Sequence, residues 1–299
     1  MWLLVDGNSV GWAVWYALPN EVRESDDFNL YTGIWRHAFL TKLVKLAKKL
    51  GNGKAVYTVV VWDGRFGASI RRRIFKEYKS KRREKYKVAE GEKDVKVTRY
   101  FDAVNEFVNR VRDTDTCRKL GVRFDQLEAD DVISAICKVL ESEEVVIYSS
   151  DMDLWQLLRY SNTKLISPRN DKEFNRNAVK RKLGIEPDYV WVYKAVVGDP
   201  SDGWSGIRGL GDKKFKKMIE EKSITEAMEE WKNFPEFRIG EKLCKLPSEW
   251  MLEKEFGKDW SSRAKRLITK WKRVKIDPPE VVISLDLRKL STADLQYLM

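Results

Sequence analysis

The chain has 299 residues, of which 43% are hydrophobic and 34% charged, so it is not a disordered chain and can form one large domain or two modest ones. Its formal net charge of +11 indicates a polyanionic partner, either a nucleic acid or an anionic membrane. No apolar run approaches the roughly 18 residues that span a bilayer, the first residues do not resemble a signal peptide, and the three cysteines form no CxxC pair. We therefore expect a cytoplasmic protein that does not enter a membrane and has neither a disulfide framework nor a zinc knuckle.

Short apolar runs in the first part of the chain are typical of buried strands. They cover Trp2–Val5, Val56–Trp62, Val145–Tyr148 and Leu165–Ile166 with its flanks. Helical patterns with one apolar face lie between these runs. Strands that alternate with helices predict a mostly parallel α/β sheet.

Three helices are predicted between the strands. The first lies within Asn29–Leu50 and is stopped by Gly51-Asn52-Gly53, the second runs from about Arg99 to Arg112, and the third begins near Glu128.

Beyond about residue 185, strand-like runs largely give way to short helical stretches, glycines and lysines. We therefore predict a core over residues 1–185 and a smaller, mainly helical region over residues 186–299 that packs on it. Glu280–Leu287 is predicted as one further strand.

Acidic residues follow the predicted strands at the points where the strands end. Asp6 follows the first strand, Asp63 the second, and Asp151 and Asp153 the third. The carboxyl ends of parallel strands gather at one edge of a sheet, where ligands bind. We therefore expect these side chains to meet at that edge.

Other acidic residues begin the third helix or lie in a turn-rich segment. Glu128, Asp130 and Asp131 open the helix, and Asp199 and Asp202 lie in the turn-rich segment. Each alone has a purely structural explanation, because carboxylates favour helix N-termini and Asp is common in turns.

Taken together, so many carboxylates at one edge would repel one another strongly unless cations lay between them. Oxygen ligands select Mg²⁺ or Mn²⁺ over zinc, and His37 is the only imidazole in the chain. Two such ions about 4 Å apart could clamp the attacking and leaving oxygens of a phosphodiester. The predicted metal ligands are Asp6, Asp63, Glu128, Asp130, Asp131, Asp151, Asp153, Asp199 and Asp202.

Basic residues alternate with aromatic rings in the segment from Ile70 to Lys87, which holds ten Lys or Arg residues and two acids. Cations for phosphates and rings for bases suit a single-stranded nucleic acid, whereas the structural alternative is a solvated basic helix face. The predicted DNA-binding residues of this segment are Arg72, Arg73, Lys76, Tyr78, Lys81, Arg82, Arg83 and Tyr86.

The segment from Gly206 to Lys214 is typical of a helix–hairpin–helix turn. Gly209 and Gly211 would let backbone amides approach phosphates at a helix N-terminus, and Lys213 and Lys214 follow at once. The alternative is a simple turn between two helices.

Together these motifs resemble the 5′ nuclease family, which comprises the flap endonucleases and the 5′-to-3′ exonucleases of phages and of bacterial DNA polymerase I. The free-standing phage enzymes are the most similar members, and the resemblance extends over nearly the whole chain. The motifs are Val5-Asp6-Gly7-Asn8, Glu77-Tyr78-Lys79, Glu128-Ala129-Asp130-Asp131, Ser149-Ser150-Asp151-Met152-Asp153, Gly198-Asp199-Pro200-Ser201-Asp202 and Gly209-Leu210-Gly211-Asp212-Lys213.

The resemblance implies a PIN-like (resolvase-like) α/β core with a basic helical arch over about residues 70–98. It implies two Mg²⁺ ions, replaceable by Mn²⁺, at the nine carboxylates, catalytic roles for Lys79, Arg71 and Asp153, and a K⁺ site at the Gly209–Gly211 turn. The implied substrate is DNA with a 5′ single-stranded flap or end beside duplex. The implied enzyme is a monomer that acts in replication or repair, in the host cytoplasm if it is viral.

Two departures from the family pattern concern the hairpin. The usual Asp-Asn-Ile-Pro-Gly reads Asp202-Gly203-Trp204-Ser205-Gly206, and Phe215 stands where a small residue is usual. Both affect the expected duplex contacts more than the chemistry.

Three other functions are compatible with parts of the pattern. A haloacid-dehalogenase-type phosphatase would need a second Asp where this chain has Asn8. A non-catalytic DNA-junction binder of the same fold would have lost acidic ligands, and all nine expected positions hold Asp or Glu in this chain. A PIN-type ribonuclease is disfavoured by the basic arch and the glycine hairpin.

Overall fold

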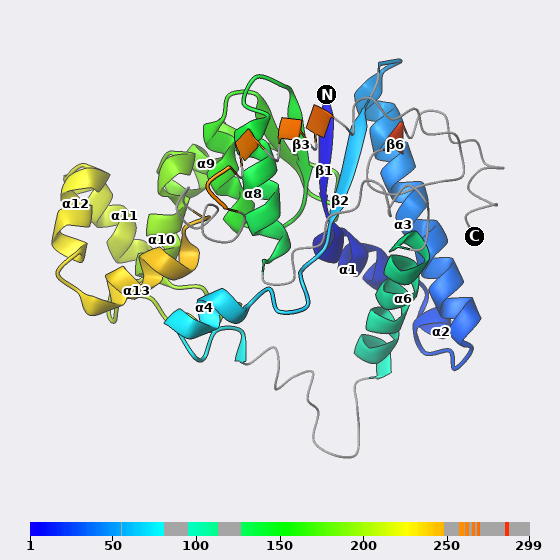
Figure 1. Cartoon of the computed structure of the whole chain (residues 1–299). Coiled ribbons are helices and arrows are strands. Elements are labelled where there is room, and N and C mark those ends of the chain that lie inside the picture. The colour runs from blue at the N-terminus through cyan, green and yellow to red at the C-terminus, as the bar shows by residue number, and fades with distance from the viewer. Residues whose placement is uncertain are drawn as a thin grey trace.

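The computed structural model describes residues 1–54, 56–80, 95–112 and 127–247, together with short pieces between residues 257 and 286. Its centre is a six-stranded sheet with the order β5-β4-β3-β1-β2-β6 (Figure 1). The four inner strands are parallel, and both edge strands are antiparallel to their neighbours. The strands are β1 (Trp2–Asp6), β2 (Tyr57–Val61), β3 (Val145–Tyr148), β4 (Thr163–Ile166), β5 (Glu173–Phe174) and β6 (Leu285–Asp286).

The prediction of a mostly parallel α/β sheet is confirmed, and the four predicted apolar runs coincide with β1 to β4 to within two residues. The C-terminal strand predicted within Glu280–Leu287 corresponds to β6, which pairs with β2.

Helices cover both faces of the sheet, and β1 shows why. Leu3 and Val5 pack into one hydrophobic core, whereas Trp2 and Leu4 pack into the other. Successive side chains of a strand point to opposite faces, so an unbroken apolar strand needs cover on both. On the Leu3 face lie α1 (Gly7–Ala17), α2 (Asn20–Arg23), α3 (Phe28–Gly51) and α6 (Val95–Arg112).

The Trp2 face is covered by α8 (Ala129–Val139), the 3₁₀ helix η1 (Asp153–Arg159), α9 (Arg176–Leu183), the 3₁₀ helix η2 (Pro187–Tyr189) and α10 (Val190–Val197). Three more helices, α11 (Asp212–Glu221), α12 (Ile224–Trp231) and α13 (Pro235–Cys244), extend the same core. The expected helical character beyond residue 185 is therefore confirmed for the described part. The domain boundary stays a prediction, because these helices share one core with α8 and β1.

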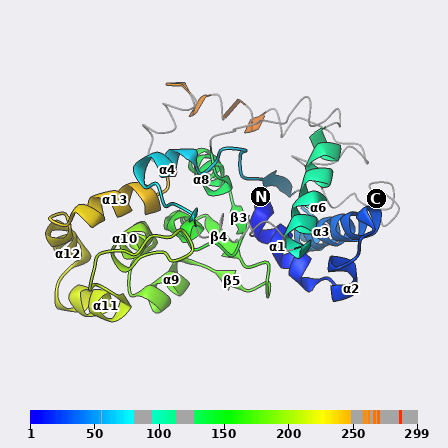
Figure 2. The same ribbon diagram turned by 90° about the horizontal axis from the view of Figure 1, so that it is seen from below.

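The short helix α4 (Ser69–Ile74) contacts α13 and lies between α13 and α8 when the molecule is seen from below (Figure 2). This position brings the start of the basic segment next to the beginning of α8. Among the described helices, none is both long and apolar enough to cross a membrane.

The end of α3 shows how the local sequence sets an element boundary. Asn52 caps the helix in the left-handed conformation, with φ of 39°, and its N–H donates to the carbonyl of Lys48 at 3.3 Å. Asparagine tolerates this conformation better than most residues, so the predicted stop at Gly51-Asn52-Gly53 is confirmed.

Candidate active site

Three neighbouring strands deliver carboxylates to one edge of the sheet, as predicted. Asp6 ends β1, Asp63 follows β2, and Asp151 follows β3. All three line one cleft of about 1800 Å³. In β1 and β2 the pairing register sets Asp6 opposite Val61, so the two strands end side by side.

Asp6 is both the end of β1 and the N-cap of α1. Its carboxylate accepts hydrogen bonds from the Ser9 N–H at 3.0 Å and from the Ser149 hydroxyl at 2.7 Å. Burial raises the pKa of Asp6 to about 7, with smaller contributions from the charges of Asp151 and Asp63 and in spite of these two hydrogen bonds.

The other two strand-end carboxylates are held by backbone amides. Asp63 accepts from the N–H of Ala129, the first residue of α8, at 2.8 Å. Asp151 accepts from the N–H of Asp153 at 2.9 Å. These bonds fix the strand ends relative to α8 and η1.

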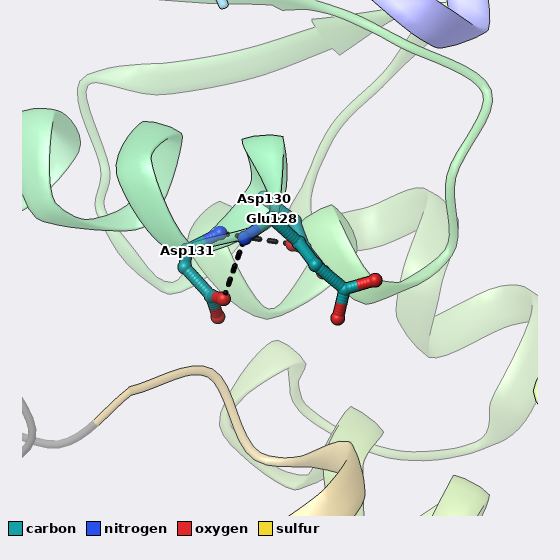
Figure 3. Close-up of side chains that lie close together, drawn as sticks. All are labelled: Glu128, Asp130 and Asp131. Atoms are coloured by element: carbon teal, nitrogen blue, oxygen red, sulfur yellow. Dashed lines mark hydrogen bonds between the residues drawn. The ribbon is translucent and has the colours of Figure 1, made fainter. Parts of the chain in front are cut away.

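A first carboxylate group lies at the beginning of α8. It consists of Glu128, Asp130 and Asp131, which offer oxygen atoms within 4.8 Å of one another (Figure 3). Glu128 is the N-cap of α8. Its N–H donates a hydrogen bond to the carboxylate of Asp131 at 3.2 Å, which is part of a capping box. The helix start thus accounts for the local positions of these acids.

Arg71 of α4 neutralises part of the first group. Its guanidinium binds Asp131 through two bonds of 2.9 and 2.8 Å and Glu128 through one of 2.8 Å. Its Nε donates to the carbonyl of Leu243 at the end of α13, at 3.1 Å. Arg71 is buried, and its charged contacts in this structure are with Glu128 and Asp131. Its catalytic role stays a prediction.

The three acids of the first group differ in ionisation. Although burial opposes it, the positive charges of Arg71 and Lys79 lower the pKa of Glu128 to about 2. Burial and the neighbouring Asp131 instead raise the pKa of Asp130 well above its usual range. Asp130 forms no ion pair with any residue that the structure describes.

A second carboxylate group consists of Asp153, Asp199 and Asp202, again with oxygen atoms within 4.8 Å of one another. Asp153 begins η1, whereas the other two lie in the loop after α10. An antiparallel bridge between Asp199 and Trp204 shapes this loop, and the Ser201 hydroxyl donates to Asp199 at 2.6 Å.

Lys194 of α10 lies against the second group and was not identified from the sequence. Its ammonium is 2.6 Å from an oxygen of Asp199 and also forms an ion pair with Asp153. Burial raises the pKa of Asp153 to about 7 despite Lys194, whereas for Asp199 burial is outweighed by Lys194, which lowers the pKa. A lysine inside the apolar run Val190–Val197, just before Asp199, was a usable signal.

Lys79 connects the two groups. Its ammonium forms an ion pair with Glu128 and lies 3.9 Å from Asp202, and it lines the cleft. Its N–H donates to the carbonyl of Asp202 at 2.9 Å, and its φ of 55° is in the left-handed region that non-glycine residues rarely adopt. Against the effect of burial, the charges of Glu128 and Asp202 raise the pKa of Lys79.

Tyr78 does not have the position predicted for it. Its ring is buried in the core and its hydroxyl donates to Glu128 at 3.0 Å. The ring has no free face for a DNA base in this structure, because the aromatic body fills space beside α8. In this structure Tyr78 therefore supports the first carboxylate group through Glu128, and its ring is not positioned to stack on a DNA base.

The other predicted DNA-binding residues of the basic segment are distributed as follows. Arg72 lines the cleft, and Arg73 and Lys76 are exposed. The remaining four lie outside the described residues: Lys81, Arg82, Arg83 and Tyr86.

The glycine hairpin has the expected turn. Gly209 has φ of 83°, Gly211 is the N-cap of α11, and Lys213 and Lys214 are exposed on the first turn of that helix. Gly206, with φ of 71°, approaches α10 so closely that an added Cβ would lie 2.4 Å from the carbonyl oxygen of Val196. Glycine is required there on both grounds.

The two departures from the family pattern are packing features. Phe215 is buried, with its ring stacked on Trp231 at a centroid distance of 5.3 Å. Trp204 is also buried and donates its Nε1–H to the carbonyl of Ala195 at 3.1 Å.

Comparison with known proteins places these features in a family. The family of 5′-3′ exonuclease N-terminal resolvase-like domains matches residues 1–184. DNA polymerase I of Caldicellulosiruptor bescii is 29% identical over 274 residues, which are 89% of this chain and 28% of that protein. The 5′-3′ exonuclease of Aquifex aeolicus is 29% identical over 77% of this chain and 73% of its own length. The chain thus spans little more than a quarter of the length of the polymerase relative.

Two solved structures of bacteriophage T5 proteins have a similar fold. The T5 D15 flap endonuclease in complex with DNA and metal ions has a TM-score of 0.69 at 18% identity, over 90% of this chain and 98% of that one. The T5 D15 protein co-crystallised with metal ions has a TM-score of 0.62 at 19% identity, with the same coverage. The predicted resolvase-like fold is therefore confirmed.

Proposed function

Because this chain belongs to the 5′-3′ exonuclease family with an N-terminal resolvase-like domain, we propose that it is a structure-specific 5′ nuclease that hydrolyses phosphodiester bonds of DNA at 5′ flaps and 5′ ends. The observation that carries the proposal is that both carboxylate groups contribute to the lining of one cleft, the first through Glu128 and Asp130 and the second through Asp199, with Lys79 between the groups. A non-catalytic DNA binder of the same fold has no need for so many buried and partly buried acids beside one cleft.

The donor set fits two hard divalent cations. The first carboxylate group would hold one ion and the second group the other, and Asp6, Asp63 and Asp151 at the strand ends would complete the predicted set of nine ligands. All nine offer carboxylate oxygens, which suit Mg²⁺ or Mn²⁺. When bound, the two cations would activate water and offset the charge on the phosphate and the leaving oxygen.

Lys79 is the protein's own cation in the cleft. Its backbone bond to Asp202 and its ion pair with Glu128 hold the ammonium at the boundary between the groups. A cation fixed there can stabilise the negative charge that develops on phosphate oxygens during cleavage, and it need not reorganise to do so.

Two parts of the chain would hold the DNA, namely the glycine turn with the start of α11 and the basic segment after Lys79. The exposed Lys213 and Lys214, next to the glycine turn, would bind the backbone of the duplex, and the turn would hold K⁺ with its carbonyls. The basic segment after Lys79 would bind the single strand, and the net charge of +11 favours both contacts. The protein would act as a monomer in replication or repair, in the cytoplasm of its cell or of its host.

The test uses three labelled DNAs: a duplex with a 5′ flap, the same duplex with a 3′ flap, and a blunt duplex. Each is incubated with the full chain in Mg²⁺, in Mn²⁺ and in EDTA, and the products are sized. We expect cleavage near the junction of the 5′ flap in either cation and none in EDTA. Cleavage of the 3′ flap, or full activity in EDTA, would overturn the proposal. Tight flap binding without cleavage would identify a non-catalytic junction binder.

A further inference from the structure

The second carboxylate group contains a cation of its own. The side chain of Lys194 is 3% exposed, and its ammonium contacts two of the three carboxylates of the group, Asp153 and Asp199. Val192, Ala195 and Val196 on the same helix are fully buried, so α10 is anchored in the core and presents the lysine from a rigid support. A buried ammonium in this environment is stable only beside carboxylates.

The first group is neutralised in a different way. Arg71 contacts Glu128 and Asp131 but not Asp130, and Asp130 lines the cleft whereas Arg71 does not. The guanidinium of the first group therefore lies outside the lining of the cleft, to which Glu128 and Asp130 contribute. In the second group, Lys194 itself lines the cleft next to Asp199.

We propose that Lys194 is a resident cation of the second carboxylate group, which competes with the second divalent ion and makes that group bind metal more weakly than the first. The inference rests on the proposed function in one respect, namely that both groups hold divalent cations. Two cations within a few ångströms repel each other, and the ammonium must give up two carboxylates before a divalent ion can take them over. The second site is thus a position of exchange between a lysine and a metal ion.

The alternative is that Lys194 only positions its two carboxylates. The two roles predict opposite effects of removing its charge. A competitor, when removed, leaves a stronger metal site, whereas a positioning residue, when removed, leaves a disordered and weaker one. Lys194→Met keeps most of the side-chain length and apolar stem and removes only the ammonium.

The experiment measures metal binding without DNA. The metal-free full chain is titrated with Mn²⁺, and free Mn²⁺ is followed by electron paramagnetic resonance and the heat by calorimetry. We expect the wild type to bind two ions with unequal affinity. In Lys194→Met the weaker affinity should rise by about tenfold or more, the scale of a change of 1.4 kcal/mol in binding free energy. The stronger affinity should change much less.

Two control variants accompany it. Lys194→Arg keeps the charge and should keep the second site weak. Lys180→Met removes an equal charge from an exposed lysine paired with Glu186, outside the cleft lining, and should leave both affinities unchanged. Thermal unfolding gives a second readout, because Mn²⁺ should raise the melting temperature of Lys194→Met by more than that of the wild type.

An unchanged or lower second affinity in Lys194→Met overturns the proposal, and so does an equal rise in Lys180→Met. If Lys194→Met does not fold, Lys194→Gln replaces it, and two equal affinities in the wild type would by themselves refute the inference. The outcome is independent of catalysis: a chain that fails to cut DNA but shows the predicted affinities refutes the nuclease function alone.

Discussion

The two carboxylate groups have the same ligand chemistry but different internal cations. The guanidinium of Arg71 is planar and rigid, and it binds Glu128 and Asp131 through several fixed bonds. The ammonium of Lys194 is a compact charge on a flexible stem. One group therefore has a cation held by several fixed bonds, whereas under our proposal the cation of the other group exchanges with a metal ion.

The groups also differ in how the chain assembles them. The first comes from four consecutive positions, 128 to 131, and needs only the beginning of α8. The second joins Asp153 with Asp199 and Asp202 from a distant loop, so it depends on tertiary packing around α10. Mutations should therefore affect the two groups unequally.

The largest expected effect follows loss of a carboxylate from the second group. Asp153→Asn should lower the single-turnover rate of 5′-flap cleavage on the order of 10³-fold, because an amide is a poor ligand for a hard cation. Flap binding should be unchanged or tighter, since a charge that repels phosphate is removed. Asp188→Asn, an exposed acid outside the cleft lining, is the control. Equal losses in both variants would mean that the second group has no special role.

Removal of the rigid cation should mainly reduce stability. Arg71→Met leaves the buried Asp131 without its cation and removes one of the two cations beside Glu128, so it should lower the free energy of unfolding by about 3 kcal/mol, as for other broken buried ion pairs. Urea unfolding in EDTA measures the change, with the exposed neighbour Arg73→Met as control. A loss below about 1 kcal/mol, the scale of a surface ion pair, would contradict the assigned role.

Lys79 contacts both carboxylate groups, so its substitution tests whether the groups act together. Lys79→Ala should slow the cleavage step on the order of 10²-fold and change flap affinity little, because it acts on charge developing in the transition state. Single-turnover cleavage at saturating enzyme measures the rate. The exposed Lys76→Ala, from the same segment, should cleave normally. A near wild-type cleavage rate for Lys79→Ala would mean that Lys79 is only one phosphate contact among several.

Asp153 of the second group and Glu128 of the first group should respond to pH in opposite directions in the metal-free protein. The pKa of Asp153 is raised to about 7, so as pH rises from about 4 to 7 the unfolded chain ionises first and stability falls. Asp6 acts in the same sense. The pKa of Glu128 is lowered to about 2, so its stabilisation is complete above the ordinary value of 4.5 and is lost as pH falls toward 2.

Urea unfolding in EDTA at several pH values measures this dependence. Asp153→Asn should reduce the fall in stability between about pH 4 and 7 but not remove it, because Asp6 remains. A wild-type stability that rises steadily from about pH 4 to 8 would contradict the raised pKa values.

The smallest effect is expected outside both groups. Lys213→Ala should weaken flap binding by less than about tenfold and lower the salt dependence by about one counterion, with little change in the cleavage rate at saturation. A slow cleavage step in this variant would show that duplex contacts and the carboxylate groups are not separable.

The sequence predicted the features that follow from local chemistry. The sequence placed three carboxylates correctly because parallel strands end at one edge of the sheet; they are Asp6, Asp63 and Asp151. It also placed the end of α3 at Asn52 correctly, because a helix stop has a recognisable composition. The sequence did not reveal contacts made across the fold. Nothing local indicates that Arg71 meets Asp131, or that Tyr78 turns its ring into the core.

The bond from Arg71 to Leu243 joins residues 172 positions apart, and it matters for how the protein is made. Closing a loop of this length costs conformational entropy, and contacts between residues so far apart in sequence form slowly. A nascent chain that has emerged as far as residue 184, where the family match ends, already carries seven of the nine carboxylates, but it lacks Asp199, Asp202 and the Leu243 carbonyl that accepts from Arg71 Nε. The second carboxylate group of such a chain would therefore be completed only after α10 and the loop that follows it have been synthesised, and the anchor of Arg71 only after α13.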